Sequence, residues 1–580
     1  MRRPLKCLAL ISLVAIFLLV AACGRNDDAR GAFALDWVDL PVAPSAFTVS
    51  TDDPRLAEAG LQWRNGNLFF DQTRRITVGI WDRGNEHDPT PYANFWTNWI
   101  REEILQTHNI AVEFITIPRW SEVPYMAALL AADSAPFVGS TFDYPTILSF
   151  AEMEGIIDMA PLLAAYRDWL PNLYDLLTPT NVYWNQDPNN GTIWAMEGRL
   201  MNNARVNTFV RSDWLDVLNM RPPTTLQEFE DMLIAFRDNA QLLLGSDANQ
   251  MIPFRLTQDV GWTGDPIITS FIPNNITDQQ WFVYGFDDRR FMMPGIMEGV
   301  RVLNRWFNEG LLWEPFSLYA SGDAVVGDLL RLGFVGSFVS NWDYPFRPSE
   351  AIITTMQEEI GPEANFIVVS PFQNDAGIVR KQLSNPIDRK IFFPHTNTEP
   401  LASLLYLDWI SRLDTRRFLQ FGEEGLNHVR HANGAFEMLP FDLEARPNTP
   451  FMASGSNFDI TITVNGLDTR DPESFASIAL GFPGIPAAQV QAALLAQTSH
   501  AWVGRAVNVG AIEAEAMFGG DGLNETRNAV FNQAVTAPVA QFDAVWNAGM
   551  NSYMQAGGRA IIEERRQAWI DNFGDIQNLP

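Results

Sequence analysis

The sequence predicts an α/β protein with more than one domain. Strand-like and helix-like segments alternate between residues 75 and 139, the alternation returns in the middle of the chain, and the chain has 580 residues. Alternating strands and helices favour a parallel sheet with right-handed crossovers. Because a single hydrophobic core stops growing at about 250–300 residues, a chain of this length divides into at least two domains.

The amino terminus has the pattern of a lipoprotein signal. A basic start is followed by an apolar run from Leu8 to Ala22, which is shorter than the roughly 20 residues of a membrane-spanning helix. Small residues then precede Cys23, as in a lipobox. We therefore expect residues 1–22 to be removed and Cys23 to be acylated, which would hold the protein at the outer face of the membrane. A plain signal peptide with a chance cysteine is the alternative.

Residues 23–74 are expected to form a lipidated tether and linker with one surface-docked strand. From Arg75 the pattern sharpens, with strands predicted at 76–81, 110–117 and 135–139 and helices near 92–104 and 125–132. These elements would form a parallel sheet, which binds ligands beyond the carboxyl ends of its strands.

The middle of the chain contains a helix start at Thr225 and Glu228, which have the spacing of a capping box. A helix is predicted from residue 226 to 236, a strand at 334–338 and another helix near 398–409. The last residues, from Phe542 to Phe573, have helical spacing.

Composition narrows the classes of partner. The formal net charge of −29 argues against nucleic acid or anionic lipid as a partner of the bulk surface. The chain has 19 Trp and 39 Phe, and tryptophan is favoured where a flat apolar partner such as a sugar ring can stack. We expect no cofactor, no catalytic residues and no metal site, and a monomeric protein.

Ten candidate ligand-binding residues lie mainly where strands are expected to end. They are Trp81, Asp82, Arg83, Arg119, Trp120, Asp143, Trp262, Trp342, Asp343 and Glu424. A carboxylate that accepts two sugar hydroxyls beside a stacking ring would form a sugar clamp, and an arginine would pair with a uronic acid.

Each candidate also has a purely structural interpretation. Trp81 would fill a domain core, Asp82 would cap the next turn, and Arg83 and Arg119 would form surface ion pairs. Glu424 would simply end a helix. The pair His428 and His431 has the spacing of a metal site on a helix, but without a third ligand two surface histidines are the simpler interpretation.

The order of several segments resembles the family 1 extracellular solute-binding proteins, the receptors of carbohydrate ABC importers, and most of all their long lipoprotein branch. The resemblance extends from about Arg75 to the end. The segments that carry it are the lipobox at Cys23, 129–136, 211–216 with 223–229, 407–410 and 422–425. The chain departs from the family at Phe137, where aspartate usually follows proline, and at 191–196, which lacks the usual lysine and proline.

This resemblance implies a two-lobed periplasmic-binding-protein-like fold (type II) with a ligand cleft between the lobes. We expect the first lobe to comprise 75–201 and 388–452, and the second lobe to comprise 202–387 and the helical 453–580. The implied function is capture of an oligosaccharide and its delivery to an ABC permease, from a lipid anchor on the cell membrane. A surface-anchored polysaccharide-degrading enzyme and a peptide or signal receptor of the same fold are the alternatives.

Overall fold

The computed structural model describes most of the chain beyond the predicted tether. The described residues are 50–84, 90–142, 144–176, 187, 190–200, 206–369, 381–382, 387–440, 459–465, 472–498, 501–502, 509–510 and 512–574. Within them no helix is long and apolar enough to cross a membrane. The predicted signal peptide, Cys23 and Asp143 lie outside the described residues.

The described part of the expected linker forms a short helix and a hairpin. Helix α2 (Pro54–Glu58) precedes the antiparallel strands β1 (Leu61–Arg64) and β2 (Asn67–Phe70). The turn is Asn65-Gly66, and both residues have positive φ, which a two-residue hairpin turn of type I′ requires. Only one strand was expected here, although Asn-Gly is a strong hairpin signal.

The first sheet begins with a parallel pair. Strand β3 (Arg74–Asp82) pairs in register with β4 (Ile110–Pro118), and helix α3 (Phe95–His108) forms the crossover. Ile76, Val78 and Ile80 are buried, as expected for a strand with alternating apolar residues. A parallel bridge between Val78 and Val138 adds β5 (Gly139–Thr141) on the other side of β3. The predicted parallel arrangement of three strands is therefore confirmed, although the third strand lies at 139–141 and not at 135–139.

Three later strands extend this sheet. Strand β12 (Ile387–Phe392) is antiparallel to β5 and to β6 (Met196–Leu200), and β15 (Val464–Asn465) is parallel to β6. The predicted lobe boundaries stay predictions, and β15 lies beyond the expected return at 452. Helices α4 (Glu122–Ala131), α5 (Tyr144–Glu152) and α18 (Pro400–Ile410) belong to the same part of the molecule.

The second sheet has the order β10-β7-β9-β8. Strands β8 (Ile252–Arg255) and β9 (Val335–Asn341) are parallel, whereas β7 (Val206–Arg211) and β10 (Phe366–Val369) complete it as antiparallel neighbours. Helix α10 (Leu226–Asp238) packs on this sheet and begins with the predicted capping box, in which Thr225 and Glu228 each bond the other's backbone.

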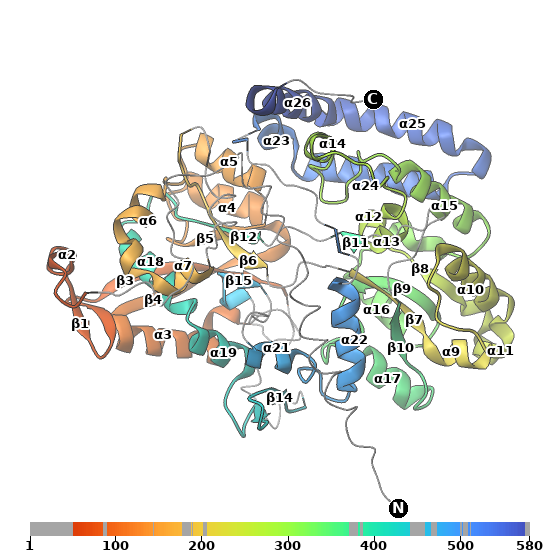
Figure 1. Cartoon of the computed structure of the whole chain (residues 1–580), viewed down its shortest axis with the longest axis horizontal. Helices are drawn as coiled ribbons and strands as arrows, with labels where there is room; N and C mark the ends of the chain where they lie inside the picture. Colours follow the sequence, from red (N-terminus) through yellow and green to blue (C-terminus); the bar gives the residue numbers. More distant parts are fainter. Residues whose placement is uncertain are drawn as a thin grey trace, which may run out of the picture. The chain divides into compact units, whose positions relative to one another are not determined.

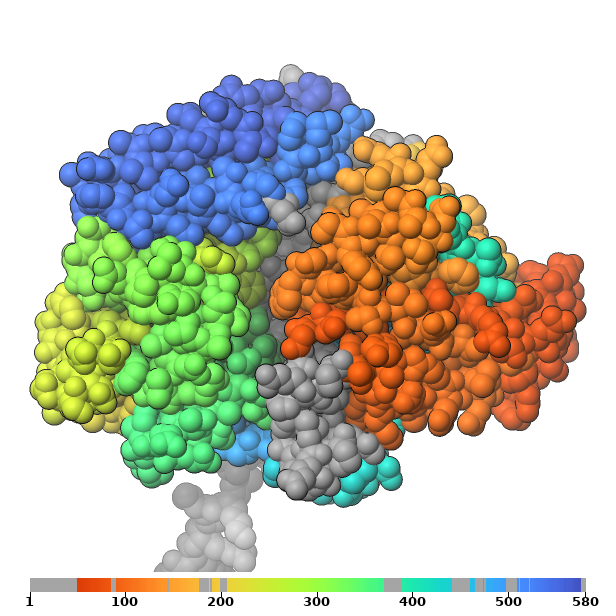
Figure 2. Space-filling view, turned by 180° about the vertical axis from the view of Figure 1, so that it is seen from behind, coloured from red at the N-terminus to blue at the C-terminus, as the bar shows by residue number. Residues whose placement is uncertain are grey.

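The carboxyl-terminal helices pack on the second sheet's helices (Figures 1 and 2, blue). Helices α24 (Asp521–Thr536), α25 (Phe542–Tyr553) and α26 (Arg559–Phe573) contact α14 (Asp278–Tyr284) and α15 (Ile296–Asn308). The predicted helical carboxyl terminus is confirmed.

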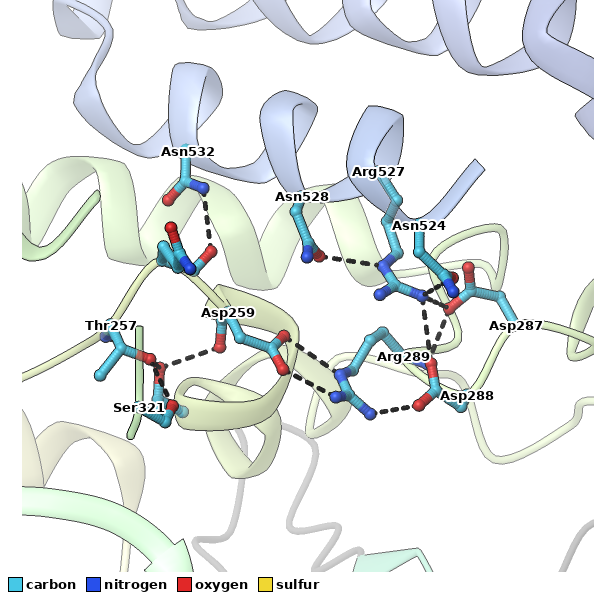
Figure 3. A network of polar contacts seen from close by, with 12 residues as sticks. Thr257, Asp259, Asp287, Asp288, Arg289, Ser321, Asn524, Arg527, Asn528 and Asn532 are labelled. Atoms are coloured by element: carbon cyan, nitrogen blue, oxygen red, sulfur yellow. Dashed lines mark hydrogen bonds and ion pairs between the residues drawn. The ribbon is translucent and has the colours of Figure 1, made fainter. Parts of the chain in front are cut away.

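An ionic network joins α24 to the second sheet's loops (Figure 3). Arg527 donates to Asp287 at 2.7 Å and to Asp288 at 3.1 Å, while Arg289 forms a bidentate pair with Asp259 at 2.7 and 3.1 Å. The side chains of Arg527 and Asp287 are only 4% and 3% exposed, so this pair is buried. The network fixes the position of α24, because a buried ion pair is costly to separate.

Candidate functional site

The carboxyl ends of β3, β4 and β5 lie at one edge of the first sheet, because these strands are parallel. The residues that follow the strand ends include Arg83, Arg119 and Phe142. Strand β12 runs in the opposite direction, and its Lys390 pairs with Thr141, so Arg389 comes to the same edge. Polar and aromatic side chains from four strands thus meet where a parallel sheet usually binds its ligand.

The rings at this edge are stacked beneath guanidinium groups. Trp81 and Phe142 are stacked with centroids 4.6 Å apart and an interplanar angle of 19°. The Arg119 guanidinium lies 4.4 Å from the Phe142 centroid, 5.2 Å from that of Trp81 and 5.1 Å from that of Trp120. Arg389 lies 5.3 Å from the Trp81 centroid. Cation–π contacts of this kind stabilise a guanidinium that has left bulk water.

Trp120 is the accessible ring of this group, which we call the arginine–aromatic cluster: Trp81, Arg83, Arg119, Trp120, Phe142 and Arg389. Trp120 is 76% exposed, whereas Trp81 is 6% exposed. Trp120 lies in a single turn of 3-10 helix between β4 and α4, directly after Arg119. Trp81 therefore supports the cluster from within, and Trp120 offers a ring face to solvent.

Two carboxylates hold the guanidinium groups in place. Asp459 accepts from Nε and Nη2 of Arg83, at 2.5 and 3.1 Å, and from Nη2 of Arg389 at 3.1 Å. Its side chain is 2% exposed, as is that of Arg389. Arg119 donates to Glu122 at 2.7 Å, and Thr141 donates to the other oxygen of the same carboxylate at 3.3 Å.

Burial shifts the pKa values of these groups. Burial alone would lower the pKa of Arg83, but the hydrogen bonds and charge of Asp459 outweigh it and raise the pKa. At Arg119 burial prevails over the charge of Glu122, and the pKa is lowered. Burial likewise raises the pKa of Glu122. The charge and hydrogen bonds of Asp459 thus outweigh the effect of burial on the pKa of Arg83, whereas the charge of Glu122 offsets only part of the effect of burial on the pKa of Arg119.

The second sheet presents a similar edge. Trp342, Asp343 and Arg347 follow the carboxyl end of β9, and Asp343 accepts from Nη2 and Nε of Arg347 at 2.8 and 3.0 Å. The two side chains of this ion pair are 20% and 24% exposed. Trp342 is half-buried and meets Phe482 edge-to-face at 5.8 Å.

The connections between the sheets bring these two edges together. Strand β6 ends at the cluster's edge with Leu200, and β7 begins opposite Asn341 with Val206. Six residues span at most about 20 Å, so the two edges are close. The positive charge of Arg347 acts on Arg83 and opposes its protonation, which places these two arginines within electrostatic reach of each other.

The structure places the predicted residues in different roles. Trp81 is packed in a hydrophobic core, and Asp82 accepts from the backbone N–H of Gly84 at 2.8 Å and so caps its turn. These contacts agree with the structural alternatives, and ligand binding by Trp81 and Asp82 stays a prediction. Arg83 and Arg119 form ion pairs that are largely buried, not the surface pairs that were the alternative.

Two predicted residues lie elsewhere. Trp262, in α12 (Val260–Thr263), is partly buried beneath Arg289 at 5.0 Å, beside the ionic network of Figure 3. Glu424 is exposed in the loop before β13 (His428–Arg430).

The two histidines considered as metal ligands have other partners. His428 is buried, with its Nδ1 3.0 Å from the carbonyl oxygen of Phe421, and His431 lies 2.6 Å from Glu437. Where the structure describes the chain, no three His, Cys, Asp or Glu side chains form a metal site.

Sequence reasoning did not find Glu122, Arg389, Asp459 or Arg347. Glu122 had a usable signal, because it stands three residues after Arg119 at the start of a helix. Arg347 had a similar signal, because it stands four residues after the predicted Asp343. Arg389 and Asp459 had none, since they reach the site only through β12 and the chain before β15. The positions of Arg389 and Asp459 depend on strand pairing between segments that are far apart in the sequence.

Comparison with known proteins identifies the fold. No family model matches the chain, and no curated protein matches its sequence. A solved structure of an alginate-binding protein matches with a TM-score of 0.60 and 13% identity, covering 86% of this chain and 98% of that one. An ABC-transporter substrate-binding protein of S. pneumoniae in complex with kestose matches with a TM-score of 0.57 and 11% identity, covering 86% and 99%.

A third match is an HMO-binding, ABC-transporter-associated solute-binding protein from Bifidobacterium longum infantis, with a TM-score of 0.56 and 14% identity, covering 87% of this chain and 100% of that one. All three are named as binding proteins. The chain therefore has the two-lobed α/β fold of the periplasmic solute-binding proteins, as the family resemblance implied.

Proposed function

We propose that this protein is an extracellular solute-binding protein that captures an oligosaccharide and delivers it to the permease of an ABC importer. One observation carries the proposal: an exposed tryptophan stands beside partly buried, ion-paired arginines at the edge of one sheet, close to a similar edge of the second sheet. The matched structures include proteins named for alginate, HMO and kestose, and two of them are named for ABC transporters.

The chemistry of the two edges suits a sugar. The ring of Trp120 offers a flat apolar face, on which the C–H face of a pyranose would stack. Arg83, Asp343 and Arg347 are each about a quarter exposed or less, so they keep polar atoms at the surface in fixed orientations. Fixed donors and acceptors bind hydroxyl groups with little loss of entropy.

Two connections between the sheets would act as a hinge. The chain passes from β6 to β7 and returns from β10 to β12, and all four ends lie at the facing edges. A ligand that contacts both edges would draw the lobes together, and the permease would recognise the closed form. We further propose that acylated Cys23 anchors a monomeric protein to the outer face of the membrane.

Substitution of Trp120 by alanine tests the proposal. We expect Trp120→Ala to weaken the binding of an oligosaccharide by about 2 kcal/mol, or roughly 30-fold, because the ring would be a stacking anchor. The unfolding temperature should barely change, since surface substitutions usually cost about 0.5 kcal/mol or less. Trp63→Ala is the matched control, because Trp63 is 40% exposed on the β1–β2 hairpin.

The assay is calorimetric titration of purified protein with pools of neutral and acidic oligosaccharides. Equal loss of affinity in both variants would refute the role of Trp120. Absence of binding to every pool would refute the proposed function itself. New reducing ends in the sugar after incubation would favour the degrading enzyme instead.

A further inference from the structure

We infer that the captured oligosaccharide carries carboxylate groups, as uronic acids do, and that Arg119 and Arg83 bind one of them. The inference rests on the proposed function and specifies its substrate class. It starts from the charges of the cluster: among the described residues, three guanidinium groups share the two carboxylates of Asp459 and Glu122. The site therefore has a positive excess in a chain whose net charge is −29.

The excess lies where a ligand could reach it. Arg389 is 2% exposed, and its Nη1 donates a hydrogen bond to the carbonyl oxygen of Val464 at 3.2 Å. Arg83 shares Asp459 with Arg389 but is 25% exposed, and Arg119 is 20% exposed. Arg83 and Arg119 are therefore the two cations of the cluster that a ligand can contact without a rearrangement of the core.

Arg119 is under-compensated by its surroundings. Among the described residues, its Nε is buried without a hydrogen-bond partner, and Glu122 is the carboxylate that it contacts. The charges of Arg83 and Arg389 also act against it. An anion bound beside Arg119 would supply the missing compensation, and a carboxylate would accept two parallel N–H bonds from the planar group.

The second lobe contributes Arg347, which is itself paired with Asp343. Arg347 acts on Arg83 from the opposite edge, so like charges from both lobes approach one another. Bringing like charges together in a partly buried site costs energy, which an anion between them would offset. A neutral sugar would remove water from the same cations without pairing them, and it would bind more weakly for that reason.

Trp120 favours a sugar over a simple organic acid. Its exposed ring lies beside the Arg119 guanidinium at 5.1 Å. A uronic acid carries its carboxylate directly on the pyranose ring, so one residue could stack on Trp120 and pair with Arg119 at the same time. The combination of a flat face and an adjacent charge fits this class of sugar.

The test compares an oligouronide with its carboxyl-reduced, neutral counterpart by calorimetric titration of the purified protein. We expect the oligouronide to bind at least about 10-fold more tightly, with an affinity that falls as salt is added. Arg119→Gln should weaken oligouronide binding roughly 10- to 100-fold and neutral-sugar binding by much less. Arg119→Lys should recover only part of the loss, because an ammonium lacks the planar fork.

Arg64→Gln is the control, since Arg64 lies 4.4 Å above the Phe69 ring of the β1–β2 hairpin and should not affect binding. Thermal unfolding of each variant shows whether it is folded. If Arg119→Gln does not fold, Arg83→Gln provides an independent test of carboxylate binding. Equal binding of the two sugars, or tighter binding of a sulfated oligosaccharide, would overturn the inference and leave the proposed function standing. Failure of both sugars to bind overturns this inference, and failure of all oligosaccharides also overturns the proposed function.

Discussion

Replacing Asp459 with asparagine should destabilise the first lobe far more than the same substitution in the second lobe. Asp459 accepts from Arg83 and Arg389, and its side chain is 2% exposed. Removing one partner of a buried pair typically costs about 3–5 kcal/mol, because a charge is left unpaired. Arg83 is 25% exposed and can turn toward water, whereas Arg389 cannot. We therefore expect about 3 kcal/mol, the lower end of this range.

Asp343→Asn is the matched control. Asp343 forms a similar bidentate pair with Arg347, but the two side chains are 20% and 24% exposed. Water can solvate both charges after the pair is lost, so a cost of about 1 kcal/mol or less is expected. The chemical change and the type of partner are the same at both sites, whereas Asp459 is more deeply buried and contacts a second arginine.

Thermal and urea unfolding, followed by circular dichroism, measure the difference. A loss of about 3 kcal/mol lowers Tm by roughly 6–12 °C in a domain of 150–250 residues, and by less in a larger cooperative unit. Adding Arg389→Met to Asp459→Asn should restore part of the stability, because the buried charge is then gone. The reasoning is refuted if the two single variants cost the same, or if the double variant recovers nothing.

Three further predictions concern other parts of the chain. Arg527→Met should cost about 3–5 kcal/mol in urea unfolding, because it leaves Asp287 buried and unpaired, and Asp287→Asn in the same chain should restore part of it. Burial and Arg412 lower the pKa of His108 to about 4. Protonation therefore favours the unfolded state, and stability should fall by about 1.4 kcal/mol per pH unit between pH 6.5 and 4. His108→Gln should flatten this profile of Tm against pH, and an unchanged slope would contradict the assignment. Thr225→Ala should cost about 1 kcal/mol in thermal unfolding through the lost cap of α10, and no measurable change would show that the cap is dispensable.

Local patterns in the sequence predicted several of the elements. Runs of apolar residues predicted β3 and β4. The Thr225–Glu228 spacing predicted the start of α10, and helical spacing predicted α25. These features depend on residues within a few positions of one another, where propensity and periodicity act directly. The hairpin at Asn65-Gly66 had the same kind of signal, although it was not used.

The sequence also identified part of the candidate site. Because the strands could be ordered as parallel, Arg83, Arg119 and Trp120 could be placed at a common edge, and the structure brings them together. The nature of their environment could not be predicted. Whether an arginine forms an exposed or a buried pair depends on the chain that covers it, and Asp459 comes from more than 300 residues away along the sequence.

By itself, the sequence determined the α/β class, the strands and helices with clear periodicity, and the residues that follow β3 and β4, because short-range periodicity encodes them. Only the tertiary structure decided which charges face one another. Strand β12 enters the first sheet antiparallel and brings Arg389 to the edge, while Asp459 reaches two arginines at once. Such contacts are set by long-range pairing and burial, whose energies belong to the folded arrangement and to no local segment.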